Sequence, residues 1–138
     1  MNTKVPKNKV SFHYSLNVQA QHIDALNHVN NIVYLQWVQE VSELHWDKLA
    51  SKEIKERCFW VALRHEIDYL KPAFENDLLT IYTWIEDIKG VKSTRIVHVY
   101  CGDTLLTKSK TTWCLLDAQT LRPKRIDEAI YEIFTKTA

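Results

Sequence analysis

The residues best suited to chemistry lie together in one short polar segment. It places a carboxylate, an imidazole and three amides directly before a long stretch without Gly or Pro: Asp24, Asn27, His28, Asn30 and Asn31. A helix N-terminus presents unpaired N–H groups and a partial positive charge, which polarise a carbonyl oxygen and stabilise an oxyanion. The same dipole favours the ionised form of a nearby aspartate. The segment therefore predicts a base or nucleophile beside an oxyanion site.

The helix that follows is expected to run from Asn31 to about Leu49. Apolar residues recur in it at helical spacing, at Val33, Trp37, Val41 and Leu44. Other apolar residues widen this stripe, namely Ile32, Leu35, Val38 and Trp46. A helix that is apolar on most sides is buried, so we expect protein to surround most of it and a sheet to wrap it.

The rest of the chain is dominated by strand patterns. Apolar and polar residues alternate over residues 9–19, which predicts a strand with one wet face. After a charged connector at 52–57, further strands are expected at 58–63, 65–70, 78–88, 93–101 and 104–116. Gly102-Asp103 is the expected hairpin turn, residues 117–125 a loop and residues 126–134 a short amphipathic helix. We predict one α+β domain over residues 1–138, with an antiparallel sheet of about five strands around one central helix.

Composition excludes several classes of function. Hydrophobic residues make up 46% and charged residues 25%, as in globular domains. A net charge of +1 argues against nucleic acid as a partner. The N-terminus lacks an apolar signal segment, no stretch is long enough to span a bilayer, and three unclustered Cys suggest reduced thiols, so we expect a cytoplasmic protein without a membrane partner. The six His lack metal-site spacing, and no Gly-rich turn indicates a dinucleotide site, so no metal or cofactor is expected.

The motif Asp24-Ala-Leu-Asn27-His28-Val-Asn30-Asn31, with Tyr34 following, resembles the hotdog-fold acyl thioesterases, in particular the 4-hydroxybenzoyl-CoA thioesterase-like group. The segment 64–72 and the later Asp77 resemble the family's second-strand and crossover pattern, so the resemblance covers roughly residues 10–120. It implies hydrolysis of acyl thioesters, most of all acyl-CoA, with no cofactor beyond the CoA of the substrate. It also implies a homodimer or homotetramer with the site at the subunit interface.

The resemblance assigns roles to individual residues. Asp24 would attack the thioester carbonyl or activate a water, while the backbone N–H near Asn31 polarises that carbonyl. His28 would join them in catalysis. Residues framing the substrate would be Asn27, Asn30 and Tyr34, and the phosphates of CoA would be held by Lys89 and Lys92. Most of the family has Gly where this chain has Asn27, and Asn tolerates left-handed backbone better than other non-Gly residues.

Several alternatives stay open at this point. Glu40, on the long helix, is an alternative catalytic carboxylate, since a sister branch of the family uses one there. The spacing of Asp24 and His28 also partly resembles acyl-acyl-carrier-protein thioesterases. A non-catalytic acyl-CoA binding module, a hotdog dehydratase and a structural oligomerisation domain are further candidates, although His45 and Asp47 do not supply a convincing dehydratase pair.

Overall fold

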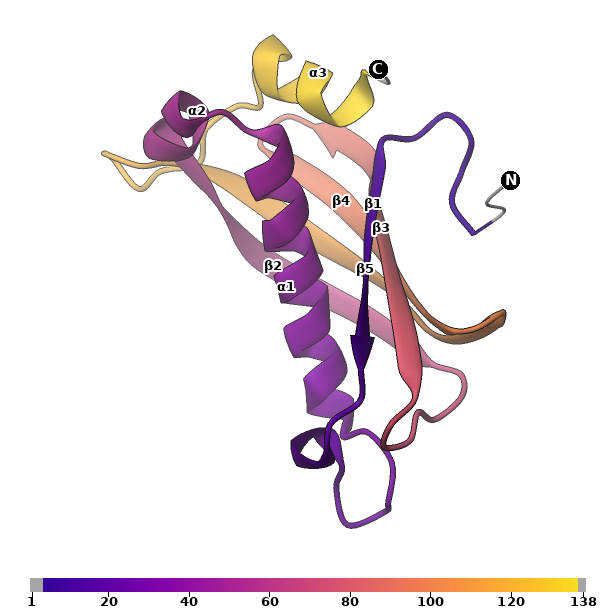
Figure 1. Ribbon diagram of the computed structural model, residues 1–138. Coiled ribbons are helices and arrows are strands. Elements are labelled where there is room, and N and C mark those ends of the chain that lie inside the picture. Colours follow the sequence, from indigo (N-terminus) through magenta and orange to yellow (C-terminus); the bar gives the residue numbers. More distant parts are fainter. Residues whose placement is uncertain (1–3, 137–138) are drawn as a thin grey trace.

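The computed structural model, which describes residues 4–136, has one long helix lying across a five-stranded antiparallel sheet (Figure 1). The strand order is β1-β3-β4-β5-β2. Their bounds are β1 Ser11–Asn17, β2 Cys58–Tyr69, β3 Leu78–Lys89, β4 Lys92–Cys101 and β5 Thr104–Asp117. The predicted α+β class and the sheet wrapped around a helix are confirmed.

Three α-helices and one 3₁₀ turn complete the described chain. They are η1 Ala20–His22, α1 Asn31–Leu49, α2 Lys52–Arg57 and α3 Glu128–Thr135. The predicted bounds of the long helix, α1, are confirmed. The segment expected to be a charged connector forms α2 instead, because the Ser51 hydroxyl caps it by accepting the Ile54 N–H at 3.2 Å.

The two strands expected at 58–63 and 65–70 are one continuous strand, β2. Its pairing with β5 shifts register between Ala62 and Arg64. A bulge of this kind adds a residue to one strand and bends it without ending the ladder. The apparent interruption in the sequence is therefore a bulge in an edge strand.

The core lies between α1 and the sheet. Fully buried residues of β3 and β4 such as Leu79, Ile81, Val97 and Val99 pack in one cluster with α1 residues that include Trp37 and Val41. Burying one such side chain contributes about 1.5–3 kcal/mol. The predicted alternation in β1 is confirmed, since its apolar residues are half-buried and its polar ones exposed.

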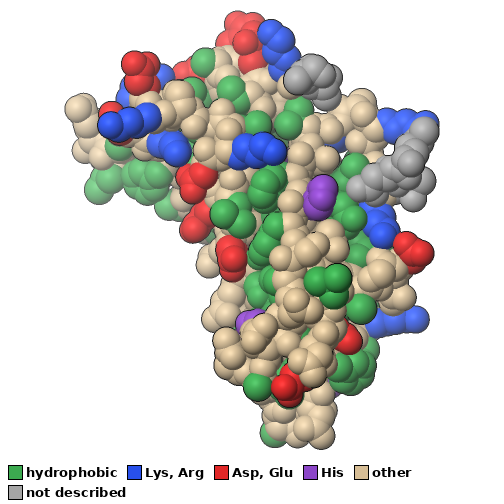
Figure 2. Space-filling view, in the orientation of Figure 1, with side chains coloured by type: hydrophobic (Ala, Val, Ile, Leu, Met, Phe, Trp, Pro, Cys, Tyr) green, Lys and Arg blue, Asp and Glu red, His purple; other side chains and the backbone are tan. Residues whose placement is uncertain are grey.

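The expectation that protein surrounds most of α1 is wrong for a single chain. Ile32 is 63% exposed and Leu44 39% exposed. The same helix exposes Gln36, Gln39 and Glu40, so its polar side faces away from the sheet. In the orientation of Figure 1, apolar side chains along this face stand beside acidic ones (Figure 2). The sheet thus covers one side of α1 and leaves the other open.

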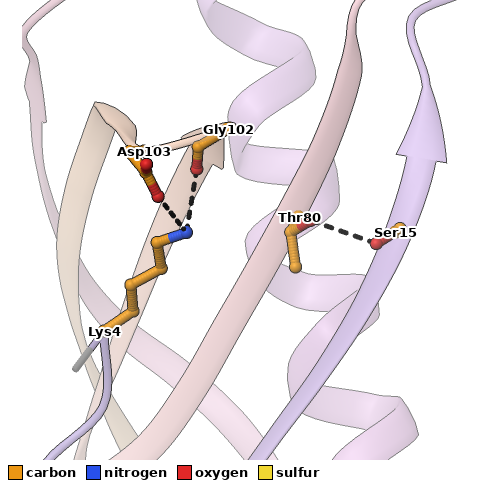
Figure 3. A network of polar contacts seen from close by, with 5 residues as sticks. All are labelled: Lys4, Ser15, Thr80, Gly102 and Asp103. Carbon is orange, nitrogen blue, oxygen red and sulfur yellow. Dashed lines mark hydrogen bonds and ion pairs between the residues drawn. The ribbon is translucent and has the colours of Figure 1, made fainter. Parts of the chain in front are cut away.

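Polar contacts tie the N-terminal segment and β1 to the sheet (Figure 3). Lys4 Nζ donates to Gly102 O at 2.9 Å and lies 3.1 Å from Asp103 Oδ1, at the β4–β5 hairpin. Ser15 and Thr80 hydroxyls meet at 3.1 Å between β1 and β3. Within the described part of the chain, no helix has the length and apolar character needed to cross a membrane.

Candidate active site

The polar segment before α1 is a closed loop rather than an extended lead-in. Asp24 N–H donates to His28 O at 3.1 Å, Asn30 N–H donates to His22 O at 2.9 Å, and Ile23 forms a bridge with Val29. These bonds clamp the start of the loop against its end. They hold Asp24 beside the residues that begin the helix.

The turn of this loop depends on Asn27. Its N–H donates to Asp24 O at 3.0 Å, and its φ is 65°. This left-handed conformation disfavours most side chains but suits Gly and, next best, Asn. The left-handed turn expected at Asn27 is confirmed by this backbone.

Asp24 is half-buried and serves the loop with one oxygen only. Its Oδ1 accepts the Leu26 N–H at 2.8 Å, which is an Asx turn. Among the described residues no hydrogen bond reaches Oδ2. The structural role of an aspartate in a turn and a chemical role are therefore compatible here, because one oxygen fixes the carboxylate and the other is available.

The first residue of α1 has a backbone donor that is not used in the described chain. Asn30 is the N-cap, and its Oδ1 accepts the Ile32 N–H at 3.0 Å. The Val33 N–H donates to Asn30 O at 2.9 Å. The Asn31 N–H has no hydrogen bond within residues 4–136. A free N–H at a helix start can polarise a carbonyl oxygen.

A cavity of about 250 Å³ opens next to this helix start. We call it the Tyr69 pocket; its lining residues are His28, Val29, Asn31, Tyr34, Tyr69, Leu70, Lys71 and Pro72. Tyr69 Oη donates to Asn31 O at 3.1 Å, which joins the end of β2 to the first residue of α1. His28 Nδ1 donates to Val29 O at 3.1 Å, so in the neutral ring Nε2 is an acceptor.

Tyr34 forms the inner wall of the Tyr69 pocket. It is 2% exposed, and burial raises its pKa to about 12. Its ring packs edge-on against Trp37 and Tyr69, with centroids 5.2 and 5.6 Å apart. Tyr34 therefore acts as a neutral packing residue at ordinary pH.

Comparisons with known proteins agree with this architecture. The family model described as "Thioesterase-like superfamily" matches residues 18–134. The chain belongs to the thioesterase-like superfamily. The predicted assignment to the hotdog-fold acyl-CoA thioesterases is thereby confirmed at the level of the family.

Individual relatives show how distant the similarity is. The long-chain acyl-CoA thioesterase FadM of Escherichia coli is 23% identical over 124 residues, which cover 85% of this chain and 92% of FadM. A 4-hydroxybenzoyl-CoA thioesterase variant solved with 4-hydroxybenzoyl-CoA has a TM-score of 0.80 at 14% identity, over 90% of this chain and 98% of that one. The Staphylococcus aureus protein SAV2348, solved in complex with CoA, also has a TM-score of 0.80, at 17% identity over 94% of this chain and 85% of that one.

Within this family framework, the structure brings together only part of the predicted site. His28, Asn31 and Tyr34 line the Tyr69 pocket, whereas Asn27 and Asn30 shape the loop beside it. Asp24 belongs to the same loop but does not line the pocket in a single chain.

Lys89 and Lys92 lie at the other end of the molecule. They pair with each other across the β3–β4 turn. The Ile126 N–H donates to Gly90 O of this turn at 2.9 Å, so the turn lies close to the start of α3 (Figure 1). β3 has 12 residues and so spans roughly 35–40 Å. The opposite end of β3 is the one near the Asp24 loop, because Asn17 pairs with Leu78 there. One chain thus does not bring these lysines to Asp24.

The alternative carboxylate, Glu40, faces a different neighbour. Burial, followed by the charge of Glu40, raises the pKa of Tyr14 on β1 well above its usual value. Glu40 is exposed and lies outside the Tyr69 pocket. Sequence reasoning did not select Tyr69 and Lys71, which do line this pocket; the only signal for them was their place in the 64–72 segment that resembles the family.

Proposed function

We propose that the protein hydrolyses acyl-CoA thioesters at the junction of the Asp24 loop and α1. The observation that carries the proposal is the unpaired Asn31 N–H at a helix start, beside a loop that holds Asp24 with one carboxylate oxygen unbonded. A donor for the developing oxyanion and a carboxylate for the incoming oxygen are the two parts that acyl transfer to water requires.

Two routes have the same overall balance. In the first, Asp24 Oδ2 attacks the thioester carbon, the C–S bond breaks and CoA leaves as the thiolate. Water then cleaves the mixed anhydride, which frees the acid and Asp24, and the proton given up by that water converts the thiolate to the thiol. In the second, Asp24 removes a proton from water, whose oxygen forms the new C–O bond as the C–S bond breaks. In both, the Asn31 N–H donates to the carbonyl oxygen as its negative charge develops.

The neighbouring side chains have supporting parts in this proposal. His28 lines the pocket, and its Nε2, which is not used by the Val29 bond, can exchange a proton with water or with the leaving thiol. Asn27 and Asn30 hold the loop and the helix start, and Tyr34 limits the depth of the pocket. Lys71 brings a cation to the pocket rim, where an anionic part of CoA would be attracted.

We expect the same site to be completed in a homodimer or homotetramer. β2 pairs with β5 on one side only, so its other edge is open. Large apolar side chains on and around this strand are exposed, including Phe59, Leu63 and Leu70. A long, open and apolar edge is usually covered by another chain. A partner could also carry its own Lys89 and Lys92 toward the phosphates of CoA bound to the first subunit.

Acyl-carrier-protein thioesters are the second candidate substrate, and binding without hydrolysis is the second candidate function. A net charge of +1 provides no strong basic surface for an acidic carrier protein, which favours CoA. Hydrolysis is favoured over binding alone because Oδ2 of Asp24 makes no hydrogen bond in the described chain and can act on the substrate or on water.

The experiment is thiol release from a panel of short, long and aromatic acyl-CoAs. The wild type is compared with Asp24→Asn and Glu40→Gln, and with Asp68→Asn as the control for an exposed carboxylate on β2. Loss of general-base or nucleophilic help should lower kcat on the order of 10²–10⁴-fold in Asp24→Asn alone. A wild type that binds but never releases thiol would support the binding module, and loss in Glu40→Gln alone would transfer the role to that residue.

A further inference from the structure

Arg95 is a buried cation for which the described chain provides no anion. It lies on β4 and is 3% exposed. Its two hydrogen bonds both leave from Nη1, to His45 Nδ1 at 2.9 Å and to Thr83 Oγ1 at 3.0 Å. Within residues 4–136 no carboxylate forms an ion pair with it. Its guanidinium also lies over the Phe134 ring, with Cζ 5.9 Å from the ring centroid. A buried charge without an anion remains costly, and an anionic ligand would offset that cost.

His45 does not neutralise this charge. A guanidinium has only donors, so Nδ1 must accept and the proton of the neutral ring lies on Nε2. Burial, and then the charge of Arg95, lower the pKa of His45 to about 3, so the ring is neutral at physiological pH. Its Nε2–H is itself buried without a partner. The Nε and Nη2 donors of Arg95 are left for another group.

Arg95 lines a cavity of about 210 Å³, to which Ser42 and Trp46 contribute from the C-terminal half of α1. We call it the Arg95 cavity; Arg95 and five aromatic residues line most of it, namely Trp46, Phe59, Trp60, Trp113 and Phe134. Ring centroids of Trp46, Trp60 and Phe134 lie 5.7–5.9 Å apart, so this wall is closely packed. The Nε1–H donors of Trp60 and Trp113 are buried and unpartnered as well.

The shape and chemistry of the Arg95 cavity restrict its ligand. An apolar cavity of about 150 Å³ holds benzene, so 210 Å³ has room for one ring and a small polar group. Flat aromatic walls favour a planar apolar body. A guanidinium fork and N–H donors favour a carboxylate, which can accept two parallel hydrogen bonds.

We propose that the Arg95 cavity binds a carboxylate carried on a single aromatic ring or a body of that size, with Arg95 as its counter-ion. The ligand could be a free acid or the far end of an acyl group whose thioester lies elsewhere. Glu43 also lines the cavity, but it is exposed and makes no ion pair with Arg95, so it stands at the entrance and repels the anion modestly.

This site is separate from the proposed hydrolytic one within the chain. Ser42, the first cavity residue along α1, lies eleven residues after Asn31, which is about 16 Å along the helix axis. Binding in the Arg95 cavity therefore does not depend on Asp24. The two proposals can fail independently, because one is measured by binding and the other by turnover.

The test uses benzoate against benzamide, its neutral counterpart, in calorimetric titrations of the whole chain. Benzoate should saturate one site, and Arg95→Gln should weaken it roughly 10- to 100-fold. Arg122→Gln, which removes an exposed arginine, should leave the affinity unchanged, and Glu43→Gln should tighten it a few-fold. Equal binding of benzamide and benzoate, or no saturable binding, would overturn the proposal.

A second measurement on the wild type avoids any question of folding. The indole Nε1–H NMR signals of Trp60 and Trp113 should shift as benzoate is added, whereas that of Trp84, which packs in a separate cluster with Tyr82 and Ile96, should not. A shift of the Trp37 signal, which packs against Tyr34 of the Tyr69 pocket, with none at Trp60 and Trp113 would contradict the assignment.

The two sources of the carboxylate are separated in Asp24→Asn, which keeps thioesters intact if the proposed function holds. If a long-chain acyl-CoA that ends in a carboxylate displaces benzoate and the methyl-ended acyl-CoA of equal length does not, the cavity holds the far end of an acyl group. If neither displaces benzoate, the cavity holds a free acid. Rapid hydrolysis by Asp24→Asn would refute the proposed function while leaving the benzoate result intact.

Discussion

The two ends of α1 differ in how deeply the polar groups around them are buried. At its start, polar groups lie in a half-buried loop: an Asp24 oxygen and the Asn31 N–H are left unbonded near the surface. Toward its C-terminal end, the polar groups are deep: Arg95 and His45 are 3% and 1% exposed and packed against aromatic rings. The first end places its polar groups near the surface, whereas the second buries them beside a cavity lined mostly by aromatic rings.

This difference separates stability from chemistry along one helix. The aromatic cluster around Phe134 fixes α3 against α1 and the sheet, so it contributes buried area. The Asp24 loop contributes little buried area and is held by a few hydrogen bonds. Substitutions in the Phe134 cluster should therefore mainly change stability, whereas substitutions in the Asp24 loop should mainly change turnover.

The largest stability effect is expected at the aromatic end. Phe134 is 3% exposed and packs on Trp46 and Trp60, so Phe134→Ala should lower the free energy of unfolding by about 3–5 kcal/mol. Leu26→Ala, in a loop position that is 72% exposed, should change it by less than about 0.5 kcal/mol. Denaturant titrations of both variants check this; equal losses would erase the contrast between the ends.

The buried His45 predicts a pH dependence of the stability. The His45 pKa of about 3 lies below its unfolded value of 6.5, so the unfolded chain binds the extra proton between these values. Stability from this group is complete above pH 6.5 and falls as pH drops toward 3, with a slope approaching about 1.4 kcal/mol per pH unit. Unfolding measured from pH 7 to 4 should show a smaller slope in His45→Gln, and an unchanged slope would exclude His45 as its source.

A smaller effect is expected at the turn of the Asp24 loop. Asn27 has a φ of 65°, so Asn27→Ala should cost about 1 kcal/mol, whereas Asn27→Gly should be neutral or slightly stabilising. Thermal unfolding of the two variants checks this, because both lack the Asn27 amide group but only Asn27→Ala keeps a Cβ. If both variants lose stability equally, the Asn27 side chain rather than its backbone matters.

How much of this could be predicted depends on the range of the interactions. The bounds of α1 and the turn at Asn27 follow from local rules: an N-cap, a stretch without Gly or Pro, and a residue that tolerates positive φ. The distance between Lys89 and Asp24 does not follow from local rules, because it depends on how β3 pairs with β1.

The Arg95 cavity was missed for a related reason. Arg95 and His45 are fifty residues apart and meet only through the fold. One local signal was present: Arg95 occupies the same alternating face of β4 as Val97 and Val99, so a charge was placed at a core position. Such a misplaced charge is a reason to expect a partner or a ligand.

The central claim is that Asp24 takes part in the chemistry and not merely in the loop. The most direct measurement pairs kcat for the best acyl-CoA with the Kd of its non-hydrolysable thioether analogue, in wild type and Asp24→Asn. We predict that kcat falls on the order of 10²–10⁴-fold while Kd and the unfolding temperature stay near their wild-type values. A variant that keeps its kcat, or one that loses binding and turnover in equal proportion, would contradict the account.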